Sequence, residues 1–466
     1  MLFNTFVFIA LFLPLTVAAF WLAPGDRAKR VILLASSLFF YGYFYWPYLG
    51  LLVGLVAVAW ACALAAERHP GTAPVWIASI LLLGVLGWFK YAGFFARVLQ
   101  DAGLIAGGSR RVHDLALPIG ISFIAFQALG YVVDVHRREF PAERRFSVVL
   151  LFKAFFPQLI AGPICRAHEL MPQLRQHFRF DGVRFASGIA IFAVGLLLKE
   201  VFADGLAPLV DTLYASSVTQ WNASEAWAAS VGFGAQIYAD FWGYSTMAVG
   251  LARMFGVDIP VNFRLPYLAT SLREFWRRWH ITLSQWLRDY LYKPLGGSRH
   301  GAPRTAFALM VTMLLGGLWH GANYTFLIWG AIHGAVQVVE HLWLGRTQPA
   351  SPARRLARAA FGWAYVFIVV FVAWVFFRAE GVGQALAIVK SMFSPGGGWA
   401  MSGSVRQILA LSLLLFLVQV PLEGFLQMLR EARVAPPLAL AASFWGVVAA
   451  VVLGAPAAVP FIYFQF

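Results

Sequence analysis

The chain has little charge and almost no cysteine. Only 12% of its 466 residues are Asp, Glu, Lys or Arg, whereas 60% are hydrophobic. A soluble core of this length could not bury so much apolar surface, so the composition excludes a soluble protein and predicts a multi-pass membrane protein. Cys62 and Cys165 lie in apolar surroundings, without the spacing of a disulfide framework or a metal site. We therefore predict no metal site.

Acidic residues are also scarce, which leaves a formal net charge of +15. The arginines occur in short clusters between apolar runs, as in cytoplasmic loops that contact anionic lipid headgroups, so we expect a lipid bilayer and no nucleic acid as partner. The cluster Arg27, Lys29 and Arg30 follows the first apolar run. The positive-inside rule therefore places the N-terminus outside, and it places the arginine-rich loop 345–358 in the cytoplasm.

Long apolar runs alternate with these loops and predict an all-α fold. Residues 1–22 lack a basic start and a cleavage site, so they predict a first span and no signal peptide. Over residues 1–466 we expect a single membrane domain with roughly ten to twelve spans. The segment 152–163 contains two prolines and one lysine. It is too short and too interrupted for a full crossing, so it predicts a re-entrant or interfacial segment.

The segment 271–292 predicts an amphipathic helix. Ser271 followed by Glu274 is typical of a capping box. Apolar residues, among them several tryptophans, occupy one face. A basic row occupies the opposite face and consists of Arg273, Arg277, His280, Ser284 and Arg288. Two interpretations fit this pattern: an interfacial helix whose arginines bind lipid phosphates, or a row that lines the entrance used by an anionic cofactor.

His320 lies in a long apolar run with glycines on both sides. An ionisable residue at membrane depth is expensive and is a functional candidate by default. The glycines thin the helix, so that a neighbouring backbone or a substrate can approach the imidazole. The alternative is a buried histidine that is hydrogen-bonded to a neighbouring helix. His333 and His341, further along the chain, are interpreted as structural or interfacial.

Four groups of residues carry a resemblance to a known family. They are Leu117–Gln127, Gln158–Pro163, Arg273–His280 with its continuation Asp289–Gly297, and Gly317–Gly321. Together they resemble the membrane-bound O-acyltransferase family, and within it the bacterial alginate O-acetyltransferase branch, over essentially the whole chain. The resemblance implies a ring of tilted transmembrane helices, with re-entrant or interfacial helices, around a central tunnel. It also implies a bacterial cytoplasmic (inner) membrane protein.

The resemblance further implies a catalytic histidine at His320 and a second functional position at His280. Acyl transfer from a thioester to a hydroxyl needs a base, donors to the oxyanion and a proton for the departing thiolate. A neutral histidine suits the first task, so we predict His320 as general base. His280 would position the donor or share in proton transfer. The predicted donor-binding or oxyanion residues are Arg273, Arg277, Trp319 and Asn323.

The C-terminal motif 460–466 is rich in aromatic residues and resembles a motif of bacterial members of this branch. On that resemblance Tyr463 receives the acyl group and relays it. The alternative is an aromatic belt at the membrane interface. The resemblance implies acetyl-CoA as donor, no permanently bound cofactor, an extracytoplasmic SGNH-hydrolase-like partner and an alginate-like polysaccharide as acceptor.

Three other functions stay open from the sequence. One is D-alanyl transfer of the teichoic-acid type, and a second is a scaffold without catalytic activity. The third is a transporter of a solute or a lipid-linked sugar, because transporters often use carboxylates inside the membrane. Four carboxylates lie in or near apolar runs: Asp134, Glu200, Asp204 and Asp240.

Overall fold

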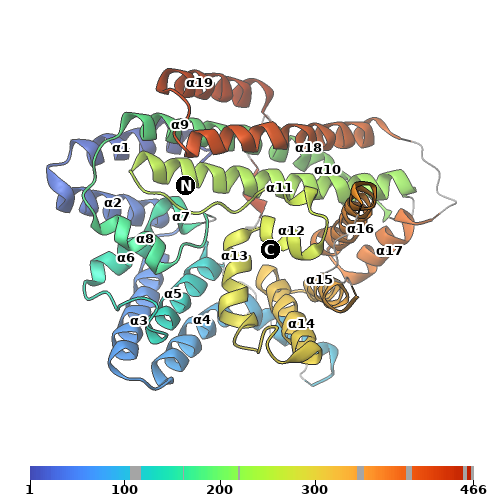
Figure 1. The fold of residues 1–466 in the computed structure, drawn as a ribbon, viewed down its shortest axis with the longest axis horizontal. Helices are drawn as coiled ribbons and strands as arrows, with labels where there is room; N and C mark the ends of the chain where they lie inside the picture. The colour runs from blue at the N-terminus through green and yellow to red at the C-terminus, as the bar shows by residue number, and fades with distance from the viewer. Residues whose placement is uncertain are drawn as a thin grey trace. The chain divides into compact units, whose positions relative to one another are not determined.

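The structure is a computed structural model built of helices (Figure 1). It describes residues 1–104, 117–160, 162–218, 221–343, 351–394, 401–454 and 459–462, and these ranges contain helices and no strand. The prediction of an all-α protein is therefore confirmed. The chain forms two compact units. Unit 1 consists of Met1–Phe192, Tyr244–Pro260 and Val434–Ser443, and unit 2 of Ala193–Gly243, Val261–Arg433 and Phe444–Phe466.

Unit 1 is built mainly from the N-terminal helices. These are η1 (Val7–Phe12), α1 (Leu13–Leu22), α2 (Gly25–Gly42), α3 (Tyr48–Arg68), α4 (Ala73–Asp101), α5 (Ile121–His136), α6 (Phe146–Ala154), α7 (Phe156–Leu159) and α8 (Ala167–Arg175). Parts of α9 (Gly182–Leu197), α11 (Ala223–Met254) and α19 (Pro436–Leu453) complete it. Helices α3, α4 and α5 pack against one another (Figure 1). Phenylalanine rings form part of the core, with Phe8 at 5.0 Å from Phe3 and 5.8 Å from Phe40.

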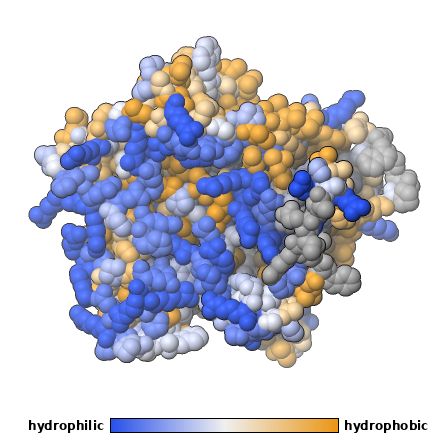
Figure 2. Space-filling view, viewed as in Figure 1, coloured by the Kyte–Doolittle hydropathy of each residue, from blue (hydrophilic) through white to orange (hydrophobic). Residues whose placement is uncertain are grey.

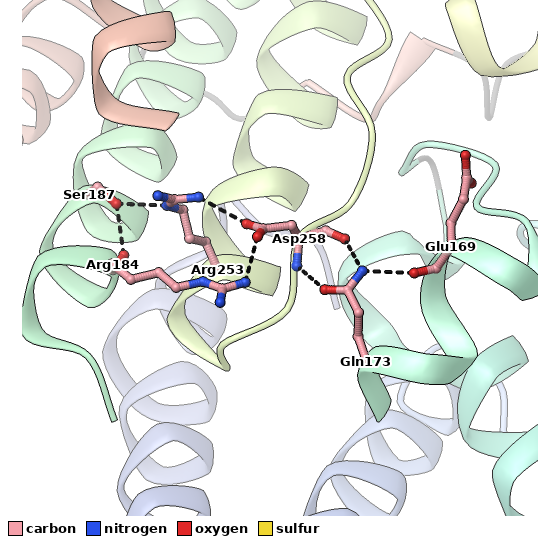
Figure 3. A network of polar contacts seen from close by, with 6 residues as sticks. All are labelled: Glu169, Gln173, Arg184, Ser187, Arg253 and Asp258. Carbon is pink, nitrogen blue, oxygen red and sulfur yellow. Dashed lines mark hydrogen bonds and ion pairs between the residues drawn. The ribbon is translucent and has the colours of Figure 1, made fainter. Parts of the chain in front are cut away.

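A polar network ties three helices of unit 1 together (Figure 3). Asp258, just after α11, accepts from Arg184 of α9 at 2.7 Å and from Arg253 of α11 at 2.9 Å. Arg253 also donates to Ser187 Oγ at 2.8 Å. The side chain of Gln173 on α8 pairs with the backbone N–H and C=O of Asp258, at 2.9 and 2.8 Å. Bonds of this kind, to charged groups, fix the loop after α11 to its neighbours.

The segment 152–163 is interrupted, as the sequence predicts. Helix α6 ends at Ala154, and α7 begins at Phe156. Between them Phe155 leaves the helical conformation, with φ −48° and ψ 104°. All four residues of α7 are buried. Irregular backbone at this depth is tolerated because protein, not lipid, surrounds it.

Unit 2 contains the remaining helices. They are η3 (Leu198–Ala203), α10 (Asp204–Ala215), η5 (Pro266–Leu268), α12 (Leu272–Arg278), α13 (Ile281–Leu287), η6 (Arg288–Tyr292), α14 (Gly301–His320), α15 (Tyr324–Trp343), α16 (Pro352–Arg378), α17 (Val382–Met392) and α18 (Gly403–Arg430). The larger part of α11 runs through this unit. Two pairs of consecutive helices pack together, α14 with α15 and α15 with α16.

Seven helices within the described residues are long and apolar enough to cross a membrane. They are Tyr48–Arg68, Ala73–Asp101, Gly182–Ala215, Gly301–His320, Pro352–Arg378, Gly403–Arg430 and Pro436–Leu453, and the shorter apolar helices are Val7–Leu22, Ile121–His136 and Val382–Met392. Figure 2 shows apolar side chains gathered over α18, where Leu413, Leu417 and Val420 are exposed. Such a surface suits contact with lipid. The multi-pass prediction is confirmed, whereas the count of ten to twelve spans, the single domain and the ring around a tunnel stay predictions.

Candidate active site

His320 is the last residue of α14 and is almost fully buried, with 4% of its surface exposed. The helix ends there because Gly321 adopts an extended backbone, with φ −159° and ψ 151°. The imidazole centroid lies 5.1 Å from the ring of Trp329 on α15 and 5.1 Å from that of Phe377 on α16. Three helices of unit 2 therefore enclose this side chain.

Glycines let α14 and α15 pack closely (Figure 1). A Cβ added to Gly317 would lie 2.2 Å from the backbone oxygen of Phe326, and one added to Gly330 would lie 2.4 Å from that of Met313. Only glycine fits at such distances. The predicted thinning of the helix is confirmed, and the neighbour that approaches is α15. The apolar run 306–342 thus forms two closely packed helices.

The helix predicted over 271–292 begins as expected but is interrupted at His280. Ser271 Oγ caps α12 by accepting from the backbone N–H of Glu274 at 3.1 Å. After α12 the chain leaves the helical conformation, and His280 adopts a left-handed backbone with φ 40° and ψ 55°. Helix α13 then starts a new axis and continues into η6. The prediction of one continuous helix is therefore wrong at this position.

Asn262, on the loop after α11, holds the interruption in place. The backbone N–H of Ile281 donates to Asn262 O at 2.9 Å, and the hydroxyl of Thr282 donates to Asn262 Oδ1 at 2.7 Å. These bonds replace partners that a continuous helix would have supplied. A left-handed backbone at a non-glycine residue costs roughly 1–2 kcal/mol, so it persists only where the surroundings impose it. Positions like this one often mark functional sites.

The interruption separates His280 from the basic row and buries it in the core of unit 2. Its side chain is 0% exposed, and the ring of Phe241 on α11 packs edge-on at 4.6 Å. The ring of Trp319 lies 5.9 Å from His280 and 5.0 Å from His320. One indole therefore contacts both predicted catalytic histidines. Burial lowers the pKa of His280 to about 3, so this imidazole is neutral at physiological pH.

A cavity of about 880 Å³ opens beside α12 and α13. Five arginines line it: Arg273, Arg277, Arg288, Arg355 and Arg358. Glu340 also contributes to the lining, and its carboxylate accepts from the backbone N–H groups of Leu272 and Arg273 and from the hydroxyl of Tyr365. The predicted basic row lines this cavity except for His280. The excess of positive charge and the volume suit a phosphorylated ligand of nucleotide size.

Aromatic side chains separate this cavity from His320. Trp276 of α12 lines the cavity, and its Nε1 donates to His333 Nδ1 at 3.3 Å. The ring of His333 lies 4.6 Å from Trp329, which in turn contacts His320. The sequence interpretation of His333 as structural missed its place between the cavity and His320. One signal was available, because Trp329 and His333 are four residues apart and so share one face of α15.

The structure places Asn323 in other contacts. The side-chain amide of Asn323 donates to Glu380 O at 3.2 Å, and its carbonyl accepts from the backbone N–H of Thr325 at 3.4 Å, which fixes the start of α15. Tyr463 and the rest of 463–466 lie outside the described residues. In the part of the chain that is described, no group of three or more His, Cys, Asp or Glu side chains is placed to hold a metal ion.

These features define a membrane protein with a buried histidine next to a basic cavity. Residues 75–379 match the membrane-bound O-acyltransferase family, and the chain belongs to that family. The family resemblance that the sequence motifs carry is thereby confirmed. The protein is an O-acyltransferase embedded in a membrane by several helices.

Three relatives whose names state an activity extend this result. A probable alginate O-acetylase of Azotobacter vinelandii is 39% identical over 452 residues, which covers 95% of this chain and 88% of that protein. A peptidoglycan O-acetyltransferase of Helicobacter pylori is 35% identical over 433 residues, covering 85% of this chain and 80% of the relative. A teichoic acid D-alanyltransferase of Streptococcus thermophilus is 26% identical over 261 residues, covering 51% and 60%. The chain is thus more similar to the two O-acetyl-transferring relatives than to the D-alanyltransferase.

Proposed function

We propose that the chain takes an acetyl group from acetyl-CoA at the cytoplasmic side of a bacterial inner membrane. The acetyl group is passed across the membrane, through an extracytoplasmic SGNH-hydrolase-like partner, to a cell-envelope or secreted polysaccharide of the alginate type. The relatives that match over most of the chain are named for O-acetylation of alginate and of peptidoglycan. Those names support acetyl as the transferred group and a polysaccharide as the acceptor.

One observation carries the proposal: a buried histidine lies behind an aromatic wall that faces an arginine-lined cavity. The arginines suit the phosphates of CoA, because one guanidinium group can donate two parallel hydrogen bonds to two oxygens of the same phosphate. The acyl end of the donor would extend from the cavity toward His320. Trp276 lies on this route, so binding of the donor requires this side chain to move.

The chemistry assigned to His320 is general base catalysis. Its imidazole removes the proton of an acceptor hydroxyl, and the oxygen attacks the carbonyl carbon of the thioester. The C–S bond breaks, and the CoA thiolate takes up the proton held by His320. Trp329 and Phe377 pack against the imidazole, which slows the attack of water on the thioester without preventing it.

Two neighbouring side chains, Trp319 and His280, would support this reaction. A histidine with a pKa of about 3 is a poor proton shuttle at neutral pH, so we assign His280 to positioning and not to proton transfer. Trp319 lies against both histidines and can present its indole N–H to the oxyanion. Asn323 is engaged with Glu380 O, which favours Trp319 for this role.

The first acceptor in this scheme is the phenol of Tyr463. Phe461 and Ile462, which precede it, are 1% and 3% exposed, and the burial of these two residues supports a relay role over an aromatic belt. The donor side is assigned to the cytoplasm because Arg355 and Arg358, which line the cavity, lie in the first turns of α16, within the arginine-rich segment 345–358 that the positive-inside rule places there. The same rule supports an N-terminus outside.

The alternatives have less support. The D-alanyltransferase matches only about half of the chain. For transport, Asp204 and Asp240 were two of the possible coupling carboxylates, but both form ion pairs with Lys199, at 2.6 and 2.9 Å. Their charge is thereby compensated within the protein, which gives both carboxylates a structural role without transport. A scaffold without activity is separated from an enzyme by the experiment below.

The test is incubation of purified protein in detergent with radiolabelled acetyl-CoA. Wild type should hydrolyse the thioester and carry covalent label, whereas His320→Ala and the bulkier His320→Gln should lose at least about 100-fold in both, as expected for loss of a general base. Tyr463→Phe should lose only the covalent label. His69→Ala, an exposed loop position, is the control. Normal turnover by a folded His320→Gln protein would refute the assignment.

A further inference from the structure

A buried ionic cluster in unit 2 consists of one lysine and two aspartates. Lys199 Nζ lies 2.6 Å from Asp204 Oδ1 and 2.9 Å from Asp240 Oδ1. The three side chains are 1–3% exposed. Two carboxylates share one ammonium, so their remaining lone pairs need hydrogen-bond donors from elsewhere. An excess of negative charge at this depth is otherwise costly.

The missing donors come from the backbone near the C-terminus. The N–H of Ile462 donates to Asp240 Oδ2 at 2.6 Å, and the N–H of Val459 approaches Asp204 Oδ2 at 3.4 Å. Lys199 in turn donates to Val459 O at 2.9 Å. Every member of the cluster therefore contacts the segment 459–462. All of these bonds involve the main chain of the segment, so the cluster fixes its backbone whatever its side chains are.

The backbone that carries Lys199 departs from a regular α-helix. Lys199 and Asp204 are five positions apart, which on a regular α-helix would point them about 140° apart. They meet because Leu198–Ala203 forms a π-helical turn, in which hydrogen bonds span five residues. Such turns occur frequently at functional sites.

The docked segment is linked to His280 through one aromatic ring. Phe461 packs against Phe241 of α11 at 5.8 Å between ring centroids, and Phe241 packs against His280 at 4.6 Å. Tyr463 follows Ile462 directly in the sequence. A bond to the N–H of Ile462 therefore fixes the backbone from which Tyr463 departs.

We propose that Lys199, Asp204 and Asp240 form a docking site for the segment 459–462 and are positioning residues for acyl transfer to Tyr463. The docking part stands on the contacts alone, whereas the positioning part rests on the proposed function. In this proposal the cluster contacts neither the donor nor the acceptor hydroxyl. It holds the backbone that precedes Tyr463. Loss of docking should therefore reduce transfer to Tyr463 and spare thioester hydrolysis at His320.

The sharpest test leaves the cluster intact and removes one donor. Ile462→Pro deletes the N–H that binds Asp240, and Ile462→Ala is the matched control because it removes the side chain but keeps the N–H. Limited digestion with a broad-specificity endoprotease, which trims the C-terminal segment at several sites once it is undocked, reports docking without any need for activity. Both variants lose the buried side chain of Ile462, so their difference isolates the N–H. Loss of one hydrogen bond to a carboxylate shifts the docked equilibrium by about 10- to 100-fold, so Ile462→Pro should be trimmed faster than Ile462→Ala by that factor.

Labelling with radioactive acetyl-CoA then tests positioning. Covalent label should fall by about tenfold or more in Ile462→Pro, with thioester hydrolysis within about twofold of wild type. Asp240→Asn, a near-isosteric change within the cluster, should behave in the same way. Equal trimming of Ile462→Pro and Ile462→Ala would overturn docking. Faster trimming with unchanged label, or a wild type that is protected from trimming yet never labelled, would overturn positioning and leave docking established.

Discussion

Replacement of Gly317 by alanine should push α14 away from α15 and displace His320. The added Cβ would lie 2.2 Å from Phe326 O, whereas ordinary van der Waals contact begins at 3.4 Å. The two backbones must therefore separate locally by about 1 Å. Overpacking of this kind costs about 1–3 kcal/mol. His320 lies less than one turn further along the same helix, and a displacement of about 1 Å at a catalytic group can lower the rate about 100-fold.

The matched control is Gly424→Ala on α18, where an added Cβ meets nothing within 4 Å. It should be neutral or stabilise by about 0.5–1 kcal/mol, because alanine favours the helix more than glycine does. Thermal unfolding in detergent and acetyl-CoA hydrolysis measure both effects. Gly317→Ala should unfold at least about 2 °C lower than wild type and hydrolyse far more slowly. If the two variants match in both assays, the close approach of α14 and α15 does not position His320.

Two further predictions concern the cavity and the strained histidine. Arg277→Ala should raise the KM for acetyl-CoA about tenfold, with little change in kcat, because it removes a charge-assisted contact to phosphate. The rise should be larger at low salt. An equal rise in KM for Arg406→Ala, an exposed control on α18, would contradict this role of the cavity. His280→Ala should be about 1 kcal/mol less stable to thermal unfolding than His280→Gly, because only glycine adopts φ 40° without strain. The reverse order of stability would show that the backbone at this position is not strained.

The features that the sequence predicted correctly depend on neighbours along the chain. Composition and apolar runs gave the all-α multi-pass class, because lipid imposes length and hydropathy on each helix separately. The cap at Ser271 and the basic row on one face of 271–292 are likewise local patterns. The row indeed lines a cavity, as one of its two interpretations required, since Arg273, Arg277 and Arg288 are among the lining residues.

The features that were missed depend on residues distant in sequence. The break at His280 is held by Asn262, which lies outside the helical pattern and reveals no pairing by its position. The place of His333 follows from how α15 packs against α12, through a bond to Trp276. The pairing of Asp204 with Lys199 needs a π-helical turn that periodicity does not indicate, and the pairing of Asp240 with Lys199 joins two helices that are distant in sequence.

The residues to which we assign a function in unit 2 lie where regular helices are interrupted. His320 ends α14, His280 separates α12 from α13, and Lys199 lies in a π-helical turn. A regular helix satisfies its own backbone and directs every side chain outward at fixed angles, toward lipid or a neighbouring helix. An interruption allows a side chain to point elsewhere, but it leaves backbone groups that need partners, so it survives only where protein supplies them. Asn262 supplies them at His280, and the left-handed backbone there would relax without it. Substitution of such supporting residues should therefore impair catalysis although they touch no substrate.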